Sequence, residues 1–543
     1  MISTLERRSE MLRSAAADGL DLVVIGGGIN GVGILLDAAA RGFRCLLLEG
    51  DDLAVGTSSR SSKLIHGGLR YLEGHEFGLV RQALAERATL LRVAPHLVDL
   101  RRFVLPVAGG WSQRLYIGAG LGLYDGLGGR RGGRFRALSP TALADRAPAV
   151  RSDLFEGGFE YSDGVTDDAR LVIAVARTAR QLGARLVTQA QVTGLLRAKG
   201  RVAGVVVKDR MTGDDVEIPS ACVVDATGAF DVQLTDSASA ASVIRSRGTH
   251  LVIARDRIAS DVGLTLRVDG RVIFIVPWES SWLLGTTDVV HDGAVARPTA
   301  TPGEVSYLLH AANRSLDVEL TAGDVLATFA GIRPLVGSPT QAPGPVSREH
   351  HIDERTDGML VLRGGKLTTY RVVAAEVVDR VATQLRRAVA SSTSSLPLTG
   401  AAPRPALDRL SQQLQRRGLA PDVASSLVSR YGRESVDVAD VAARWGLQGR
   451  LLDHLPYIEA EVWWSVDHED ALTIDDVLSR RTRAALQDRD QAEAAAGVVA
   501  DILGAKLGWD RRTRLEAVTA YSESRGEYAV PHAEGRIREA VAG

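Results

Sequence analysis

Three glycines near the N-terminus have the spacing of a dinucleotide-binding turn. Gly26, Gly28 and Gly31 follow an apolar stretch typical of a buried parallel strand (residues 21–25) and precede a helical pattern. The first glycine allows the bend, the second lets a pyrophosphate approach the backbone, and the third lets helix and strand pack closely. Glu49 ends the next predicted strand, where an acid accepts ribose hydroxyls and disfavours NADP. The pattern predicts a bound dinucleotide.

Two later segments favour FAD over NAD. Residues 222–228 (CVVDATG) are predicted to form a buried strand that ends in a turn of small residues, which suits a second backbone approach to the cofactor. Residues 364–370 (GGKLTTY) place two glycines before a helix, whose positive end could face the electron-rich edge of an isoalloxazine ring. A nicotinamide enzyme would not need this C-terminal return. We therefore expect noncovalently bound FAD.

The densest polar motif is residues 57–73 (TSSRSSKLIHGGLRYLE). Its five hydroxyl side chains and Lys63 suit contacts with phosphate and ribitol, although each hydroxyl taken singly is typical of a solvated loop. His66 follows, and Arg70 and Tyr71 come soon after it. A histidine between polar loops and an arginine is a candidate site residue rather than a purely structural one.

Four further side chains lie in motifs outside this segment, namely His250, Arg333, Arg348 and Lys366. Arg333 is bracketed by apolar residues, so its charge needs an anionic partner, either a ligand or a buried structural carboxylate. His350 and His351 are adjacent on a predicted strand and therefore point to opposite faces, which argues against a metal site there.

The elements that must position these residues change in character along the chain. The middle of the chain mixes helical stretches with alternating strands, and residues 281–288 (SWLLGTTD) follow 271–278 closely enough to form a hairpin. Residues 391–403 are rich in serine, proline and glycine and are predicted to form a linker. Residues 404–543 carry helical spacing, which indicates a separate all-α domain.

Composition narrows the classes of protein that remain. The 543 residues carry a formal net charge of −1, which gives no overall electrostatic case for nucleic-acid binding. The two cysteines, Cys45 and Cys222, lie in separate apolar runs, which argues against disulfides and for a reducing cytoplasmic environment. We expect no signal peptide and no stretch of about 20 apolar residues that would span a membrane.

Taken in order, these motifs resemble the FAD-dependent glycerol-3-phosphate dehydrogenase family of aerobic, quinone-linked enzymes. The motifs are GGGINGVG, the 57–73 segment, FEYSDGVTDDARL, GTTD, GIRPL, GGKLTTY and DVLSRRTR. The similarity runs from about residue 21 to 370, and more weakly to about 483. It implies an α/β fold: a Rossmann-type FAD domain, an antiparallel substrate domain and an all-α C-terminal cap domain.

The resemblance also implies domain boundaries and site residues. FAD-binding segments would lie at about 20–105, 155–240 and 325–390 within an oxidoreductase region of residues 1–390, with the substrate domain between them. The implied FAD contacts are Gly26, Gly27, Gly28, Ile29, Asn30, Gly31, Glu49, Thr57, Ser58, Ser62, Lys63, Leu64, Thr227, Gly228, Lys366, Leu367 and Thr368. The implied substrate pocket comprises Arg70, Tyr71, His250, Arg333, Arg348 and Lys366. One departure is ATGAF, where a bulkier ATG-x-W is commoner; it leaves the ATG turn intact.

The activity implied is oxidation of sn-glycerol 3-phosphate to dihydroxyacetone phosphate, with electrons passing through FAD to a membrane quinone. We expect Arg70 and Arg348 to bind the phosphate, Arg333 to lie at the developing carbonyl oxygen, and Lys366 to lie near flavin or phosphate. His66 is the first candidate for the base and His250 the second.

Two other functions remain open. The first is a glycerol-3-phosphate oxidase that passes electrons to oxygen, although the long insertion of bacterial oxidases is not evident. The second is a flavin-binding module of a nucleic-acid-modifying enzyme, against which the near-zero net charge argues. A homodimer is also left open.

A quinone acceptor would require contact with a membrane, and residues 101–136 are the predicted site of peripheral attachment to its cytoplasmic face. This segment interleaves apolar and aromatic residues with arginines, which suits the headgroup boundary of an anionic bilayer. Its glycines predict a short helix plus a loop rather than one long helix. The alternative is that the apolar residues pack inside the substrate domain and the arginines are solvated.

Overall fold

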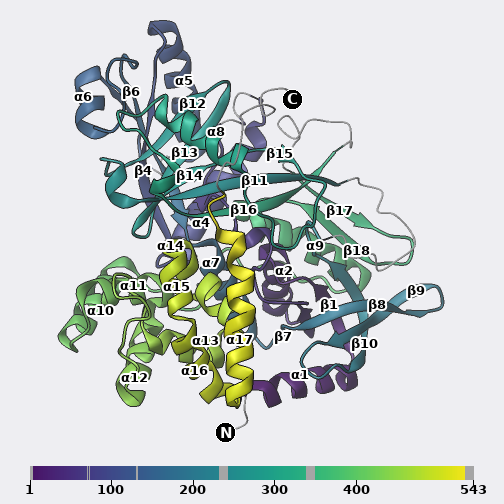
Figure 1. Cartoon of the computed structure of the whole chain (residues 1–543). Helices are drawn as coiled ribbons and strands as arrows, with labels where there is room; N and C mark the ends of the chain where they lie inside the picture. Colours follow the sequence, from purple (N-terminus) through teal and green to yellow (C-terminus); the bar gives the residue numbers. More distant parts are fainter. Residues whose placement is uncertain are drawn as a thin grey trace.

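The first of two large sheets carries the N-terminal glycine turn. The computed structural model describes residues 4–69, 71, 74–129, 133–230, 243–337 and 349–531. The sheet runs in the order β17-β18-β10-β1-β2-β7, and β18, β10, β1, β2 and β7 are parallel (Figure 1). Strand β9 extends it as an antiparallel partner of β10, and β8 pairs antiparallel with β9. The bounds are β1 Leu20–Ile25, β2 Cys45–Leu48, β7 Arg185–Val187, β8 Ala190–Ala198, β9 Arg201–Asp209, β10 Asp215–Asp225, β17 His350–Glu354 and β18 Leu360–Gly364.

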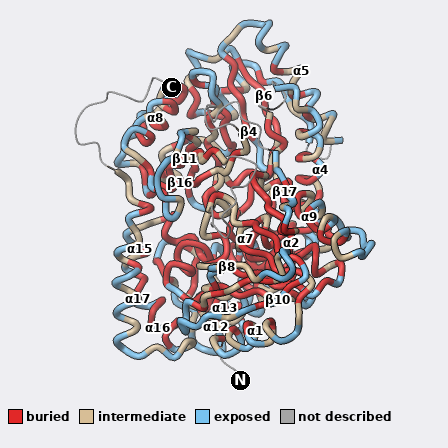
Figure 2. Tube along the Cα trace, turned by 90° about the vertical axis from the view of Figure 1, so that its right-hand side faces the viewer, coloured by how far each residue is buried: buried red, intermediate tan, exposed pale blue. Residues whose placement is uncertain are grey.

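Both faces of this sheet are covered, which is why its central strands are continuously apolar. In β1, Leu22 and Val24 face one side of the sheet, where they join a hydrophobic cluster with the helices that cover that side. Val23 and Ile25 face the other side, where they join a cluster with the N-terminal helix. The covering helices are α1 Thr4–Asp18 on one face, and α2 Ile29–Ala40, α4 Phe77–Val93, α7 Asp168–Gln181 and α9 Tyr370–Gln384 on the other. Figure 2 shows buried backbone concentrated around α2, α7 and β10.

The second sheet is antiparallel except where β12 pairs with β4. Its order is β15-β11-β14-β13-β12-β4-β6-β3, with β16 beside β11 and β5 beside β6. The predicted hairpin is confirmed as β13 and β14, with Phe274 opposite Gly285. The bounds are β3 Leu64–Ile65, β4 Val98–Pro106, β5 Arg136–Leu138, β6 Gly158–Thr166, β11 Val243–Ala254, β12 Gly263–Val268, β13 Arg271–Trp278, β14 Ser281–Gly285, β15 Val289–Val290 and β16 Val325–Val336. Helices α6 Pro140–Arg146 and α8 Pro302–Asn313 flank it.

Helices occupy the chain from Arg404 onward. They are α10 Arg404–Arg416, α11 Pro421–Tyr431, α12 Ser435–Trp445, α13 Glu459–His468, α14 Ala484–Gln487, α15 Arg489–Ala494, α16 Ala496–Leu507 and α17 Arg511–Ser524, with a π-helical turn at Asp476–Arg481. Apolar side chains of α13 to α17 share one cluster with Phe103, Val252 and Phe329 of the second sheet, whereas those of α10, α11 and α12 form a separate cluster with α13. The helical part is therefore packed onto the sheet rather than tethered beside it.

The segment 391–403 contains no helix or strand, yet it packs on the helices that cover the first sheet. The Leu398 side chain is buried in the cluster beside α2, and its N–H donates to the Val93 carbonyl at 2.8 Å. Thr399 N–H donates to the Thr178 hydroxyl at 2.9 Å. The composition of a linker is thus compatible with a fixed path across α4 and α7.

One expected element differs from the structure. Residues 111–127 form a single helix, α5 Trp111–Leu127, where the glycines predicted a short helix and a loop. Ile117, Leu121 and Tyr124 are buried at helical spacing, and a Cβ at Gly118 would lie 3.3 Å from the Phe159 ring. Packing against the second sheet therefore compensates for the low helix propensity of glycine, about 1 kcal/mol per residue.

Candidate functional site

The N-terminal turn has a backbone geometry that only glycine accommodates. Gly26 has φ +107°, and a Cβ there would lie 2.9 Å from the Ala226 carbonyl oxygen. A Cβ at Gly31 would lie 1.9 Å from the Gly26 carbonyl oxygen. Because β1 pairs in parallel with β10, with Ile25 opposite Asp225, the turn after each strand lies at the same edge of the sheet. The two expected backbone approaches to the cofactor are therefore adjacent.

Helix α2 begins at this turn without a side-chain cap from Gly28. The Ser58 hydroxyl accepts the Ile29 N–H at 2.9 Å, and the Asn30 amide donates to the Gly364 carbonyl at 3.1 Å. Asn30 Oδ1 is buried and has no hydrogen-bond partner among the described residues. A helix start whose own Ncap residue has no side chain, beside an orphaned polar atom, fits the pyrophosphate of a dinucleotide.

Glu49 lies beside the turn at the carboxyl end of β2. Its carboxylate accepts the Gly27 N–H at 2.6 Å and the Asp51 N–H at 2.8 Å. Burial outweighs these hydrogen bonds and raises its pKa to about 7. This is the position from which an acid would bind the adenosine ribose hydroxyls.

The second turn, after β10, is braced from within. Thr227 donates its N–H and its hydroxyl to Asp225 Oδ1, at 2.9 and 2.6 Å. Arg363 on β18 donates to the other oxygen of Asp225 at 2.8 Å. Gly228 then takes a positive φ of 66°. The buried Asp225–Arg363 pair thus fixes the shape of the ATG turn.

The hydroxyl-rich segment lies between the two sheets. Thr57 donates its hydroxyl to the Ile332 carbonyl of β16 at 2.5 Å. Lys63 has a φ of 57°, and its ammonium is fully buried in an ion pair with Asp168 at 2.8 Å. Its side chain therefore anchors the segment and does not supply the phosphate contact that the sequence suggested; a contact with FAD would come from its backbone.

Asp168 is the centre of this anchor. Its Oδ1 accepts Lys63 Nζ and Arg483 Nη2, and its Oδ2 accepts the N–H and the hydroxyl of Ser61. Burial alone would raise the pKa of Asp168, but the two cations outweigh it and hold the pKa below its usual value. Asp168 and Arg483 occur in two motifs that carried the family resemblance, FEYSDGVTDDARL and DVLSRRTR, but nothing in their residue types marked them as partners.

Arg333 and His250 lie on one face of the second sheet. In the antiparallel pair β11–β16, Ser246 is opposite Arg333, Gly248 opposite Gly331, and His250 opposite Phe329. Alternate residues share a face, so His250 and Arg333 point to the same side. A Cβ at Gly248 would lie 2.1 Å from Arg333 Nη2, which shows that the guanidinium extends over this glycine toward His250.

The loop after β14 holds Arg333 in place. Arg333 Nη2 donates to the Thr286 hydroxyl at 2.9 Å, and Nη1 donates to the Thr287 carbonyl at 3.2 Å. Asp288 lies 3.5 Å from Nη1. The GTTD motif therefore orients the arginine, and Asp288 is a carboxylate partner for its charge.

His250 is buried and neutral. Its ring stacks on Phe329 at a centroid distance of 4.8 Å, and Nε2 lies 2.8 Å from the Ser62 hydroxyl. Burial, followed by the nearby Arg333 and Lys63 charges, lowers its pKa to about 3. His66 lies over the same face of the sheet: its backbone N–H donates to the Thr368 hydroxyl at 3.3 Å, and its ring packs edge-to-face with Phe274, which is level with His250 across β14.

The C-terminal return reaches the N-terminal turn. Gly364 accepts the Asn30 amide, and the helix α9 begins at Tyr370, six residues later. The Lys366 ammonium lies 3.6 Å from the centroid of the Tyr71 ring. Arg70 and Arg348, the expected phosphate ligands, lie outside the described residues.

The arrangement suits a dinucleotide and a small anionic alcohol. Two glycine turns, the start of helix α2 and Glu49 line one edge of the first sheet. A neutral imidazole and a guanidinium on the second sheet supply a proton acceptor and a cation. Within the described ranges no three His, Cys, Asp or Glu side chains are grouped to hold a metal ion.

Comparisons with known proteins agree with this geometry. Residues 21–380 match the family model "FAD dependent oxidoreductase", and residues 391–514 match "C-terminal domain of alpha-glycerophosphate oxidase". The chain is 39% identical to glycerol-3-phosphate dehydrogenase of Mycobacterium leprae, over 95% of this chain and 90% of that protein. It is 37% identical to the human mitochondrial glycerol-3-phosphate dehydrogenase, over 94% of this chain and 74% of that protein.

A solved structure extends the agreement to the whole fold. The glycerol-3-phosphate dehydrogenase from Bacillus halodurans, complexed with FAD, superposes with a TM-score of 0.81 at 28% identity, covering 99% of this chain and 100% of that one. The expected fold class and the FAD cofactor are thereby confirmed. The chain belongs to the FAD-dependent glycerol-3-phosphate dehydrogenase family.

Proposed function

We propose that this protein oxidises sn-glycerol 3-phosphate to dihydroxyacetone phosphate and passes the electrons to a membrane quinone. Membership of the family supports the substrate. The observation that carries the chemistry is the pair on the β11–β16 face, where a buried neutral His250 lies beside the guanidinium of Arg333. Oxidation of an alcohol needs a proton acceptor and a cation for the oxygen that becomes a carbonyl.

FAD, when bound, accepts the hydride from C2 of the substrate. His250 would take the hydroxyl proton, and a dianionic phosphate nearby would raise its pKa from about 3 toward the working pH. Arg333 would stabilise the developing carbonyl oxygen, and Lys366 would lie near the phosphate or the flavin. We place His250 ahead of His66 as the base, because His250 lies two residues along β11 from Gly248, over which the Arg333 guanidinium extends.

Product formation tests the reaction. Protein loaded with FAD and supplied with sn-glycerol 3-phosphate and a soluble dye should form one dihydroxyacetone phosphate for each two-electron reduction of the dye. Glycerol without the phosphate should react far more slowly. Equal rates with glycerol and glycerol 3-phosphate would exclude the proposed substrate.

The acceptor requires its own test. After reduction by glycerol 3-phosphate, the flavin should be reoxidised rapidly by a short-chain quinone and slowly by air-saturated buffer. Reoxidation by oxygen at the quinone rate, with stoichiometric hydrogen peroxide, would identify an oxidase instead.

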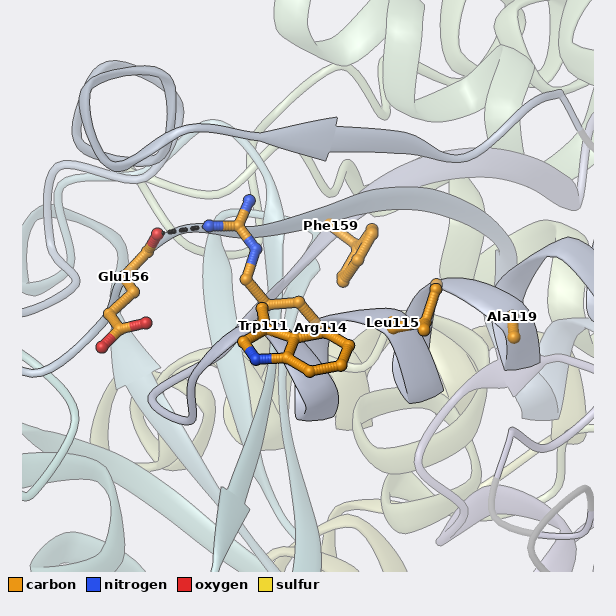
Figure 3. A pocket seen from close by; sticks show the side chains of 7 residues that line it. Trp111, Arg114, Leu115, Ala119, Glu156 and Phe159 are labelled. Atoms are coloured by element: carbon orange, nitrogen blue, oxygen red, sulfur yellow. Dashed lines mark hydrogen bonds between the residues drawn. The ribbon is translucent and has the colours of Figure 1, made fainter.

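For the surface that meets the membrane we propose helix α5. Trp111, Leu115 and Tyr116 on this helix are 78%, 65% and 61% exposed. Trp111, Leu115 and Ala119 line a shallow hollow whose floor includes Phe159, and Arg114 donates to the Glu156 carbonyl at 2.6 Å (Figure 3). In Figures 1 and 2, α5 lies at the end of the molecule opposite α1.

Charge near α5 suits an anionic bilayer. Arg101, Arg102, Arg134 and Arg136 are exposed on the strands and loops around it. Exposed aromatic and aliphatic side chains enter the headgroup boundary while arginines meet lipid phosphate. No helix in the described part of the chain is long and apolar enough to cross a bilayer. We therefore propose peripheral attachment at the cytoplasmic face.

Liposome flotation tests this surface with a matched pair of leucines. Leu115→Ser combined with Trp111→Ser should reduce flotation with anionic vesicles at least severalfold. Each apolar side chain that enters the bilayer contributes about 1.5–3 kcal/mol to the free energy of binding. Leu515→Ser on α17 is the control, since Leu515 is 61% exposed but lies on a different helix. Equal flotation of all variants would place the membrane surface elsewhere. Activity with the soluble dye should be unchanged in each variant.

Glu49 is expected to determine how tightly FAD is held. Glu49→Gln removes the charge that would bind the ribose hydroxyls while preserving the size of the side chain. Loss of charge-assisted hydrogen bonds of about 1.5–3 kcal/mol predicts a roughly 10- to 150-fold rise in the FAD dissociation constant. Fluorescence titration of the apoprotein with FAD measures it. An unchanged constant would remove Glu49 from the ribose site.

A further inference from the structure

The Ser62 hydroxyl contacts the imidazole of His250, the proposed base. Ser62 Oγ is 2.8 Å from Nε2 of His250. His250 Nδ1, the other ring nitrogen, is buried and has no hydrogen-bond partner in the described part of the chain. Buried polar atoms are nearly always hydrogen-bonded, so the orphaned Nδ1 points to a missing ligand. The substrate hydroxyl is the group that the proposed reaction brings there.

Ser62 is held in place from both sides. Ser61, before it, donates its N–H and hydroxyl to Asp168 at 2.9 and 2.7 Å. Lys63, after it, donates its N–H to the Ser61 hydroxyl at 3.0 Å and its ammonium to Asp168 at 2.8 Å. Because both neighbours are tied to one buried carboxylate, the Ser62 backbone has little freedom to carry its hydroxyl away from His250.

The imidazole is equally constrained. Phe329 stacks on it with ring planes 8° apart. On its edge, a Cβ at Gly285 would lie 2.3 Å from His250 Cδ2, so the β14 backbone is seated directly against the ring. A ring flip would exchange Nε2 with Cε1 and Nδ1 with Cδ2, and so would break the contact between Nε2 and Ser62. The ring is thus held with Nε2 on Ser62 and Nδ1 on the unpartnered side.

We propose that Ser62 is a positioning residue that sets the tautomer of His250. A neutral imidazole carries one proton, and only the nitrogen without it can act as a base. With Nε2–H donating to the Ser62 oxygen, the lone pair is on Nδ1, where it can accept the proton of the substrate C2 hydroxyl. As that O–H bond breaks, the C2 hydride leaves with its electron pair for the FAD, and the C2–O bond becomes the carbonyl. This inference rests on the proposed function.

Stopped-flow reduction of the FAD-loaded protein by sn-glycerol 3-phosphate tests the role. Ser62→Ala should lower the limiting rate of flavin reduction about tenfold, the effect of losing one orienting hydrogen bond, with the apparent dissociation constant for substrate little changed. Ser62→Thr keeps a hydroxyl and should recover most of the rate. Ser59→Ala is the matched control, because it removes a hydroxyl from the same segment that does not contact His250.

Each outcome decides the matter. A slow Ser62→Ala variant with full FAD content, rescued by threonine, supports the proposal. An unchanged rate, or an equal loss in Ser59→Ala, overturns it. Loss of FAD from Ser62→Ala would also overturn it, because Ser62 would then act through the cofactor. Failure of the wild-type flavin to be reduced would instead refute the proposed function itself, and this inference with it.

Discussion

Replacing His250 with asparagine is expected to slow flavin reduction by glycerol 3-phosphate roughly 10²- to 10⁴-fold, the usual contribution of a positioned general base. Asparagine occupies similar volume and keeps a hydrogen-bonding group near Ser62, but it cannot accept the substrate proton. Stopped-flow measurement of the limiting reduction rate isolates this step from later electron transfer. FAD content should remain that of the wild type.

His66→Asn is the comparison that ranks the two histidines. The His66 ring packs against Phe274 on β13, whereas the Arg333 guanidinium extends over Gly248 beside His250, so the loss in His66→Asn should be the smaller. A larger loss in His66→Asn than in His250→Asn would restore His66 as the base, in the order that the sequence suggested.

Asp168→Asn is expected to be among the most destabilising substitutions in the chain. It leaves the buried Lys63 and Arg483 charges without their shared carboxylate, and breaking a buried ion pair costs about 3–5 kcal/mol. Thermal unfolding of the FAD-loaded protein should show a lower midpoint. Adding Lys63→Met to Asp168→Asn should recover part of the loss, because it removes the buried Lys63 charge, whereas Arg483 keeps Asp167 at 3.5 Å.

An exposed ion pair provides the contrast. Glu516→Gln disrupts the bridge to Arg512 on α17, where both side chains are largely exposed, and should change the free energy of unfolding by less than about 1 kcal/mol.

The stabilising effect of Asp168 should also depend on pH. Because the pKa of Asp168 is lowered in the folded protein, its contribution to the free energy of unfolding is full above the ordinary pKa of 3.8 and is lost as the pH falls below that value. Similar midpoints for Asp168→Asn and Glu516→Gln would show that the buried cluster is not a structural anchor.

Motifs with strong local rules were predictable from sequence. The turn at Gly26 and Gly31, the strand ending at Glu49 and the return at Gly364 each depend on short-range backbone geometry. The hairpin of β13 and β14 follows from two neighbouring strands with a short connection. Each of these elements is determined by residues that lie within about 20 positions of one another, so residue spacing was sufficient to predict it.

Contacts between distant segments were not predictable from spacing. Lys63 was expected at a phosphate, but it pairs with Asp168, and Arg483 reaches the same carboxylate from the C-terminal helices. The order of the two histidines also depended on which strands of the second sheet each packs against. Helix α5 formed despite its glycines because Phe159 and its neighbours pack against it. Each of these is a tertiary effect.

Anaerobic titration of the FAD-loaded protein with sn-glycerol 3-phosphate tests the central claim most directly. The visible absorbance of the oxidised flavin should bleach with about one equivalent of substrate per flavin, and dihydroxyacetone phosphate should appear in the same amount. Glycerol, and the enantiomer sn-glycerol 1-phosphate, should leave the flavin oxidised. A flavin that stays oxidised with sn-glycerol 3-phosphate, while dithionite still reduces it, would contradict the account.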